Sequence, residues 1–138
     1  MTFAEAVRSV LSKYATFHGR AARSEYWWWV LFYFLLFAVV GGIDGAVIAP
    51  MLGFEAFSRE AGQPLGMLVG LAIFLPNLAV HVRRLHDIDR SGWWLLLALI
   101  PVIGLIVIIY WAIQRGTNGP NRFGDAPMPS ASDGWSQV

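Results

Sequence analysis

Apolar residues follow one another along this chain in three long runs, which short polar segments separate. The runs cover about 25–49, 65–82 and 93–113, and each is long enough to cross the roughly 30 Å hydrocarbon core of a bilayer as a helix. Proline interrupts the second run at Pro76 and the third at Pro101, and a proline inside a helix produces a kink. We therefore expect an all-α integral membrane protein with three transmembrane helices.

The segment before the first run has the pattern of an amphipathic helix. Its apolar residues recur at spacings of three and four, at Phe3, Val7, Val10, Leu11, Tyr14 and Phe17. Thr2 and Glu5 match a capping box, which specifies the start of a helix locally. The pattern predicts an N-terminal helix over 2–17 that lies in the membrane interface, with packing against the rest of the protein as the alternative.

The third run has a second interpretation. Pro101 and Gly104 stand at its middle, so a re-entrant hairpin with two short arms is an alternative to one kinked span. We expect the kinked span, because irregular backbone exposed to lipid is unfavourable.

Composition supports a membrane protein. The chain is 57% hydrophobic and 14% charged, whereas a soluble domain has about 25% charged residues. The net charge of +1 argues against nucleic acid as a partner, and the absence of cysteine excludes disulfides and thiolate sites. We expect a single membrane domain over 1–127, and residues 128–138 are expected to form a flexible tail.

The distribution of basic residues predicts the orientation. With three spans, seven of the ten Lys and Arg residues lie on the side of the N-terminus and the loop at 83–92. The positive-inside rule then places the N-terminus in the cytoplasm and the C-terminus outside. With a re-entrant third segment, the count becomes nine to one and the C-terminus returns to the cytoplasm.

A dense polar segment lies where the second run gives way to the third, at 81–94, and its charged residues and histidines all lie between His81 and Arg90. Its histidines are five residues apart, unlike the pair four apart that binds zinc on a helix. The sequence shows no nucleophile–base pair and no glycine-rich phosphate loop. We therefore expect no metal, no cofactor and no catalytic residue.

The favoured interpretation of this segment is electrostatic. Arg83 and Asp87 are four apart and can pair on one helix, which leaves Arg84 and Arg90 for lipid phosphates or for carboxylates of a partner. A basic turn at 17–24 lies on the same side, and together these segments form a basic collar. The predicted lipid- or partner-binding residues are Arg20, Arg23, Arg83, Arg84, His86, Asp87 and Arg90. The alternative is that these charges serve only as a topology signal.

Polar residues within the apolar runs form a second candidate site: Asp44, Asn77 and His81. Asp44 comes 19 residues after Glu25, about 28 Å along a helix, and is expected at the far membrane surface. A proton- or cation-binding carboxylate is the alternative. Asn77 can satisfy backbone groups freed by Pro76 or bond to a neighbouring helix.

Three blocks of sequence together resemble a family of small bacterial inner-membrane proteins, the domain of unknown function 805. The first block contains Phe17, Gly19, Arg20, Ala21, Arg23, Glu25, Tyr26 and Trp27; the second contains 83–87 and 90–93; the third contains Gly116, Gly119, Asn121, Arg122, Phe123 and Gly124. The resemblance implies a multi-pass protein of the bacterial inner membrane without an established activity, and it supplies no catalytic residues. If the blocks form one site, they lie on one side of the membrane. Three spans separate the third block from the first two, so the C-terminal motif at 121–124 is either a structural anchor outside or the sign of a re-entrant third segment.

These features favour a non-enzymatic role. We expect an accessory or assembly subunit that packs against a larger membrane complex or against a copy of itself, because small residues (Gly41, Gly42, Gly66 and Gly70) allow close helix approach. The alternatives are a transporter or channel for a small solute or ion, and a protein that binds anionic lipid. The expected partners are membrane lipids and a membrane protein.

Overall fold

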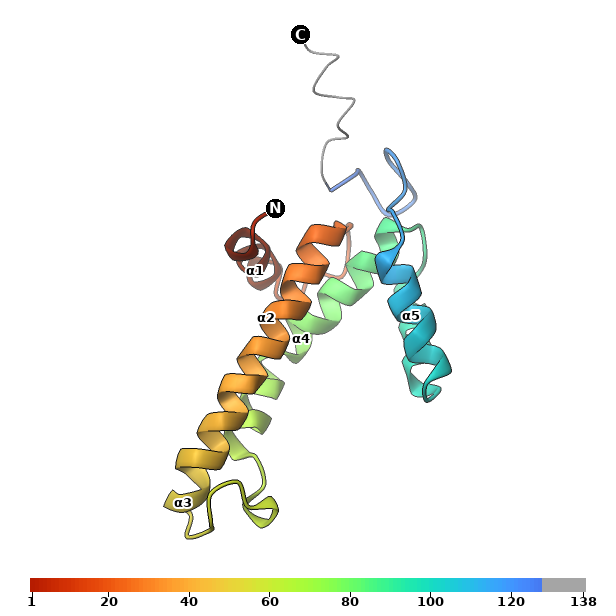
Figure 1. The fold of residues 1–138 in the computed structure, drawn as a ribbon. Coiled ribbons are helices and arrows are strands. Elements are labelled where there is room, and N and C mark those ends of the chain that lie inside the picture. Colours follow the sequence, from red (N-terminus) through yellow and green to blue (C-terminus); the bar gives the residue numbers. More distant parts are fainter. Residues whose placement is uncertain (128–138) are drawn as a thin grey trace.

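The structure is a computed structural model and describes residues 1–127; the predicted tail at 128–138 lies outside the described residues. The described chain is helical, as predicted, without an extended strand. Its elements are α1 (Phe3–Ser12), α2 (Arg23–Ile43), the π-helical turn η1 (Asp44–Ile48), α3 (Ala49–Met51), the short 3-10 turn η2 (Arg59–Ala61), α4 (Pro64–Asp87), the 3-10 helix η3 (Gly92–Leu99) and α5 (Ile103–Ile113) (Figure 1).

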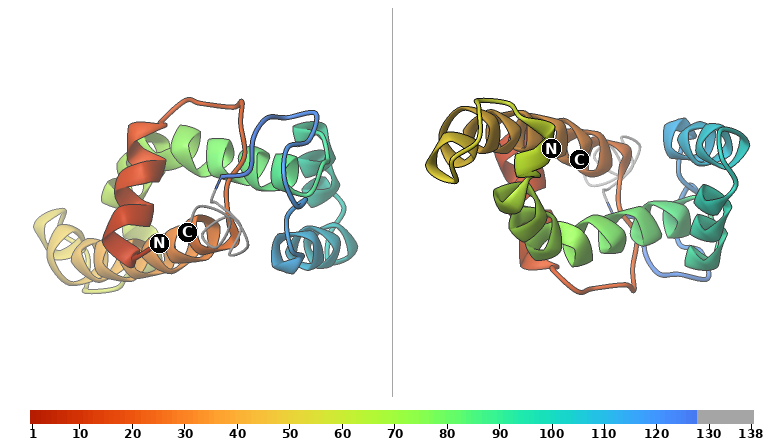
Figure 2. Two further views of the ribbon diagram at one scale, coloured as in Figure 1. Left: turned by 90° about the horizontal axis from the view of Figure 1, so that it is seen from above. Right: turned by 90° about the horizontal axis from the view of Figure 1, so that it is seen from below.

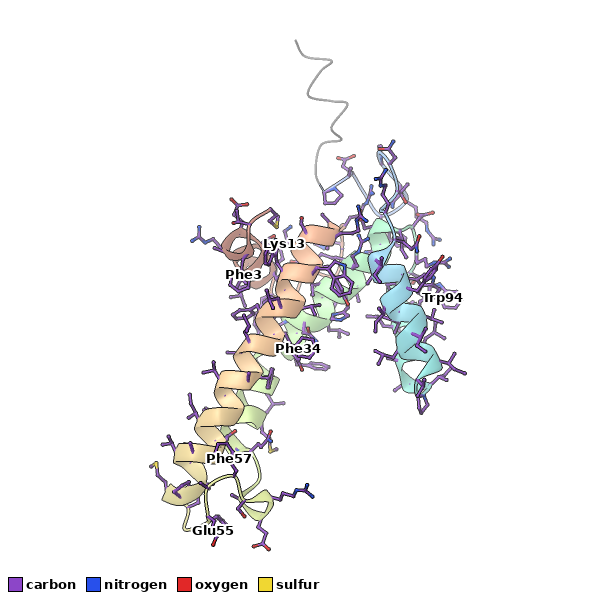
Figure 3. All side chains as sticks on the ribbon, in the orientation of Figure 1. Phe3, Lys13, Phe34, Glu55, Phe57 and Trp94 are labelled. Carbon is purple, nitrogen blue, oxygen red and sulfur yellow. The ribbon has the colours of Figure 1, made fainter. Side chains whose placement is uncertain are left out.

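Two long antiparallel helices form the axis of the molecule. Helical structure is continuous from Arg23 to Met51 over 29 residues, and α4 has 24 residues, so both are long and apolar enough to cross a membrane. Only 17% of the most apolar window of each helix is buried inside the protein, whereas the core helix of a soluble protein is mostly buried. Phe34 on α2, for example, is 66% exposed (Figure 3). The first two predicted spans therefore correspond to real helices of membrane length.

The helix α1 crosses α2 and α4 near one end of this pair (Figure 2). The predicted capping box is confirmed, because Thr2 and Glu5 exchange both hydrogen bonds. Ala6 and Val10 are fully buried, so α1 packs on its own protein, while Leu11 on the same helix stays 42% exposed.

The predicted extent of this helix, 2–17, is wrong, because α1 ends at Ser12. The following residues turn back toward the C-terminus of α4, where the carbonyl of Gly19 meets the ring of His86 at 2.9 Å. Tyr14 donates a hydrogen bond to the carbonyl of Ala72 on α4 along this path. These contacts with α4 replace the last turns of the predicted helix.

The prediction of one kinked span over 93–113 is also wrong. The segment forms a hairpin, in which η3 runs away from the end of α4 and α5 returns beside it (Figure 1). Pro101 and Val102 reverse the chain, and Val102 adopts φ 66°, a left-handed conformation incompatible with a continuous helix. Trp94 and Trp111 meet edge to face at 5.7 Å between ring centroids and join the two arms. The structure therefore has two candidate spans and a hairpin in place of three spans.

The hairpin changes where the C-terminal segment lies. Residues 114–127 return to the end of the molecule where α2 begins and α4 ends (Figure 1). The C-terminal segment thus lies at the same end of the molecule as the start of α2, and not at the opposite end as three spans would require. The three motif blocks lie together, as the re-entrant alternative requires. We call this end of the molecule the charged end.

Candidate functional site

The charged end is held by a buried ion-pair network, the charged cluster, which consists of Arg20, Glu25, Arg83, Arg84 and Asp87. All five side chains are buried, with at most 5% of the residue surface exposed. They come from the turn before α2, the first turn of α2 and the last two turns of α4. Charges buried in a protein require partners, and here the partners come from segments far apart in the sequence.

Arg20 connects the three motif blocks. Its Nε donates to Oδ1 of Asp87 at 3.0 Å, and its two terminal nitrogens donate to the carbonyls of Thr117 at 2.5 Å and Gly119 at 2.6 Å. The backbone N–H of Thr117 donates in turn to the carbonyl of Asp87 at 2.7 Å. The forked guanidinium suits this arrangement, because it presents several donors in fixed directions.

Arg84 binds the ends of two segments. Its Nε donates to the carbonyl of Ala112 at 3.1 Å, and it also donates to Gln114, so it caps the last turn of α5. A cation is favourable at the C-terminus of a helix, where carbonyls lack partners. The same guanidinium donates to the carbonyl of Ala21 at 3.0 Å and pairs with Asp87. Arg84 therefore attaches the hairpin to α4 and to the turn before α2.

Arg83 pairs with Glu25 and not with Asp87, its predicted partner four residues later. Its Nη1 lies 3.0 Å from Oε1 of Glu25, which also accepts a hydrogen bond from Ser9 of α1 at 2.9 Å. Glu25 occupies the first turn of α2, where a negative charge is favourable. Nε and Nη2 of Arg83 are buried without a partner among the described residues.

The C-terminal motif closes over the end of α4. Asn121 donates through its side chain to the carbonyl of His86 at 2.9 Å, and its own side-chain oxygen accepts from the backbone of Phe123. The ring of Phe123 stacks on the ring of His86 with centroids 4.0 Å apart. Arg122 pairs with the exposed Asp89 at 3.2 Å, and Gly124, at φ 126°, completes the turn. The motif is thus an anchor on the same end as the other two blocks.

The predicted basic collar is only partly exposed. Arg20, Arg83 and Arg84 are buried and paired within the chain, so they do not face lipid or a partner in this structure. Arg90 lies over the ring of Trp111 at 4.4 Å. Arg23 is exposed and donates to the carbonyl of Ile113 at 3.4 Å.

Asp44 lies apart from the neighbouring Asn77 and His81, so the three predicted intramembrane polar residues do not form one site. Asp44 lies at the far end of the long helices, where the sequence places it, but it is only 2% exposed, so the expectation of an aspartate on the surface of the protein is wrong. Its two carboxylate oxygens accept hydrogen bonds from the backbone N–H groups of Leu65 at 2.9 Å and Gly66 at 2.7 Å, in the first turn of α4. A carboxylate at a helix N-terminus satisfies donors that the helix leaves free. Asp44 therefore joins α2 to α4 at the end opposite the charged end.

Asn77 forms the predicted contact with a neighbouring helix. Its side-chain oxygen accepts from Nε1 of Trp29, a fully buried residue of α2, at 3.0 Å. One turn later, Nδ1 of His81 lies 2.7 Å from the carbonyl of Asn77, and the His81 ring meets Tyr26 edge to face at 5.0 Å. The polar groups of this region connect α2 with α4.

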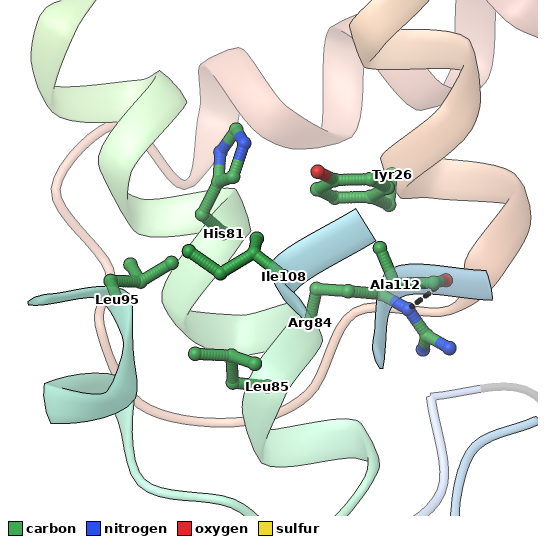
Figure 4. Close-up of a pocket in the computed structure, with 7 residues that line it drawn as sticks. All are labelled: Tyr26, His81, Arg84, Leu85, Leu95, Ile108 and Ala112. Atoms are coloured by element: carbon green, nitrogen blue, oxygen red, sulfur yellow. Dashed lines mark hydrogen bonds between the residues drawn. The ribbon is translucent and has the colours of Figure 1, made fainter. Parts of the chain in front are cut away.

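A small pocket lies where the hairpin meets the long helices. It is lined by Tyr26, His81, Arg84, Leu85, Leu95, Ile108 and Ala112 (Figure 4). Its volume of about 10 Å³ is close to the space that one water molecule needs. A pocket of this size does not admit a solute or an organic cofactor. No group of three or more His, Asp or Glu residues within 1–127 is arranged to hold a metal ion.

Comparison with known proteins shows the family to which the chain belongs. The family model described as Protein of unknown function (DUF805) matches residues 14–125, which contain all three blocks. The chain belongs to this family. It is similar to the Inner membrane protein YhaH of Escherichia coli (strain K12), with 46% identity over 119 residues, 86% of this chain and 92% of the relative. The Inner membrane protein YhaI of the same strain is 46% identical over 122 residues, with the same coverage. No solved structure matches the chain.

Family membership and the two long apolar helices support the same cellular location. The relatives are named inner membrane proteins, and the chain has helices suited to such a membrane. This supports the predicted location in the bacterial inner membrane. The three family blocks are the segments that form and enclose the charged cluster.

Sequence reasoning missed some members of this site. The sequence pattern places Glu25 only at the start of the first apolar run and in the first block, although it is the carboxylate partner of Arg83. Gly116 was not assigned a role, although a side chain there would overlap the carboxylate of Asp87. The available signal for both was their place in the blocks that carry the family resemblance.

Proposed function

We propose that the protein is a non-enzymatic accessory or assembly subunit of the bacterial inner membrane, and that it binds another membrane protein through the hairpin formed by η3 and α5. The observation that carries this proposal is the exposure of apolar side chains at the hairpin tip. Its aliphatic side chains project from the molecule, with Leu99 79%, Val102 69% and Ile103 67% exposed. The only buried residue near the tip, Gly104, packs against Leu97 of the opposite arm.

The charged cluster supports this role by fixing the hairpin. Arg84 attaches the end of α5, and Arg20 attaches the segment that follows it. Their hydrogen-bonding groups are therefore used to hold the arm at a defined position. Such a rigid apolar arm suits packing against a transmembrane helix of a partner, since association inside lipid depends on close van der Waals contact.

The orientation of the molecule belongs to the proposal. The charged end and α1 carry nine of the ten Lys and Arg residues, and Arg59, beside the far ends of α2 and α4, is the remaining one. By the positive-inside rule we place the charged end, with both the N-terminus and residues 114–127, in the cytoplasm. The exposed Arg23, Arg115 and Arg122 then lie where they contact anionic lipid phosphates.

Photo-crosslinking in native membranes tests the proposed contact. A photoreactive residue replaces Ile106, which is 60% exposed on the hairpin, and in a second variant Leu71, which is 74% exposed on α4. We expect a discrete protein adduct from position 106 and mainly lipid adducts from position 71. Co-expression of two differently tagged copies shows whether the adduct is another protein or a second copy of this chain. Lipid adducts alone at position 106 would refute the proposal.

A further inference from the structure

The two arms of the hairpin have nearly the same length, and both are too short to cross a bilayer. The eight residues of η3 extend about 16 Å at about 2.0 Å per residue, and the 11 residues of α5 extend about 16 Å at about 1.5 Å per residue. This is about half of the roughly 30 Å hydrocarbon core. By contrast, the 29 helical residues from Arg23 to Met51 extend about 43 Å.

The side chains of the hairpin are ordered by depth. Its aromatic residues lie at the base of the hairpin: Trp93, Trp94, Tyr110 and Trp111. Trp and Tyr side chains prefer the headgroup region of a membrane. Its tip, 99–103, contains only aliphatic residues and proline, and the whole hairpin from 93 to 113 has no charged residue. No residue of the tip favours its exposure to water or its placement at the opposite membrane surface. The hairpin therefore suits insertion into one leaflet.

The backbone of the reversal is largely hydrogen-bonded within the hairpin. The N–H of Gly104 donates to the carbonyl of Ile100 at 3.2 Å, and the N–H of Ile106 donates to Val102 at 3.0 Å. The N–H of Ile100 donates to Leu97 at 2.9 Å, and Pro101 has no N–H to satisfy. These bonds lower the cost of placing a turn among lipid chains, which is the cost that opposes a re-entrant segment.

The described part of the protein consequently has unequal cross-sections in the two leaflets. When α2 and α4 span a bilayer, the leaflet at the charged end contains parts of both helices and both hairpin arms, and α1 lies across the two long helices (Figure 2). The other leaflet then contains, of the described residues, only the remaining parts of the two long helices. Each helical segment is roughly 10 Å wide, so the added area in one leaflet is that of at least two helices.

We propose that the protein recognises membrane curvature: it concentrates where the leaflet at its charged end is convex. An added area in one leaflet is accommodated best where that leaflet is already expanded by bending, as for amphipathic helices that respond to curvature. The ligand of this activity is the bent bilayer itself. The proposal needs no protein partner, so it stands or fails separately from the partner contact proposed above.

Membrane tethers pulled from giant vesicles test this proposal with purified full-length protein. The chain has no cysteine, so Asn118→Cys and Glu60→Cys each provide one labelling site, at the charged end and at the opposite end. A membrane-impermeant dye added outside the vesicle labels only those molecules whose cysteine faces out. The outer leaflet of a tether is convex, so the two labelled populations experience curvature of opposite sign.

We expect the N118C population to be enriched in the tether by about twofold or more relative to a lipid dye, and the E60C population to be depleted. Equal partitioning of the two populations would overturn the proposal. Each population is the control for the other, since they share one sequence apart from the label position.

A variant of the hairpin tip provides an independent measurement. The double variant Leu99→Asn with Ile103→Asn adds polar groups to the tip. The control, Leu68→Asn with Leu71→Asn, adds the same groups to exposed positions near the N-terminus of α4, far from the charged end. We expect the tip variant to lose the difference between the two orientations and the α4 variant to keep it. If the tip variant does not fold, the comparison of the two labelled populations still decides the proposal.

Discussion

The guanidinium of Arg20 lies 3.0 Å from the carboxylate of Asp87, a residue 67 positions later in the chain, and both side chains are almost completely buried. Around this pair the beginning of α2, the end of α4 and the segment after α5 come together. The same carboxylate also pairs with Arg84. The charges that the sequence suggests for an external ligand therefore serve mainly to hold three segments of one chain.

Replacing Asp87 with asparagine tests the importance of this arrangement. The substitution leaves the buried guanidinium groups of Arg20 and Arg84 without their negative partner. Removing one partner of a buried ion pair costs about 3–5 kcal/mol, so the thermal midpoint in detergent should fall strongly. Tryptophan fluorescence recorded during heating measures this thermal midpoint.

The matched control for this change is Arg122→Ala. Arg122 pairs with Asp89 in a position where 61% and 48% of the two side chains are exposed. An exposed ion pair contributes about 0–1 kcal/mol, so this variant should melt close to the unmodified protein. Equal destabilisation by the two substitutions would mean that the buried pair has no special role.

Gly116 offers a steric test of the same region. A methyl group at this position would overlap the carboxylate of Asp87, so Gly116→Ala should displace residues 114–124 from the end of α4. Limited trypsin digestion measures this displacement through faster cleavage after Arg115 and Arg122. Gly41→Ala is the control, because a methyl group there meets no atom within 4 Å and improves helix propensity by about 1 kcal/mol. Unchanged digestion of the Gly116 variant would contradict the contact.

The contrast between predictable and unpredictable features is clear in the hairpin. The apolar run over 93–113 has the length of a span, and a length criterion alone cannot separate one span from two short arms. The outcome depends on the left-handed backbone of Val102 and on the close contact of Gly104 with the opposite arm. Both are consequences of packing, whereas the long helices α2 and α4 follow directly from uninterrupted hydrophobicity.

The ion pairs show the same limit. Sequence spacing predicts a pair between Arg83 and Asp87 on one helix, but Arg83 bonds to Glu25, 58 residues earlier. Local spacing identifies neighbours on one helix surface and cannot identify a carboxylate that another helix brings closer. The capping box of Thr2 and Glu5 was predictable because all of its atoms belong to one helical turn.

Asp44 provides a prediction for the opposite end of the molecule. Asp44→Ala removes the acceptors of two backbone N–H groups in the first turn of α4, and loss of such a cap costs about 0.5–2 kcal/mol. Asp44→Asn should cost less, since its amide oxygen still accepts one of the bonds. The measurement is the unfolding midpoint in detergent, with Glu55→Ala in the exposed loop as the control. Stability unaffected by Asp44→Ala would show that the carboxylate does not act as a helix cap.

The hairpin and the distribution of basic residues together predict which segments share a side of the membrane. Ser12, Asn118 and Glu60 are exposed, and a cysteine can be placed at each of them in this cysteine-free chain. In intact spheroplasts a membrane-impermeant maleimide should label only the cysteine at 60, because the positive-inside rule places the charged end in the cytoplasm. Permeabilised spheroplasts should label all three and control for reactivity. Labelling at 118 together with 60, without labelling at 12, would mean that residues 93–113 cross the membrane, and the hairpin would then be refuted in the cell.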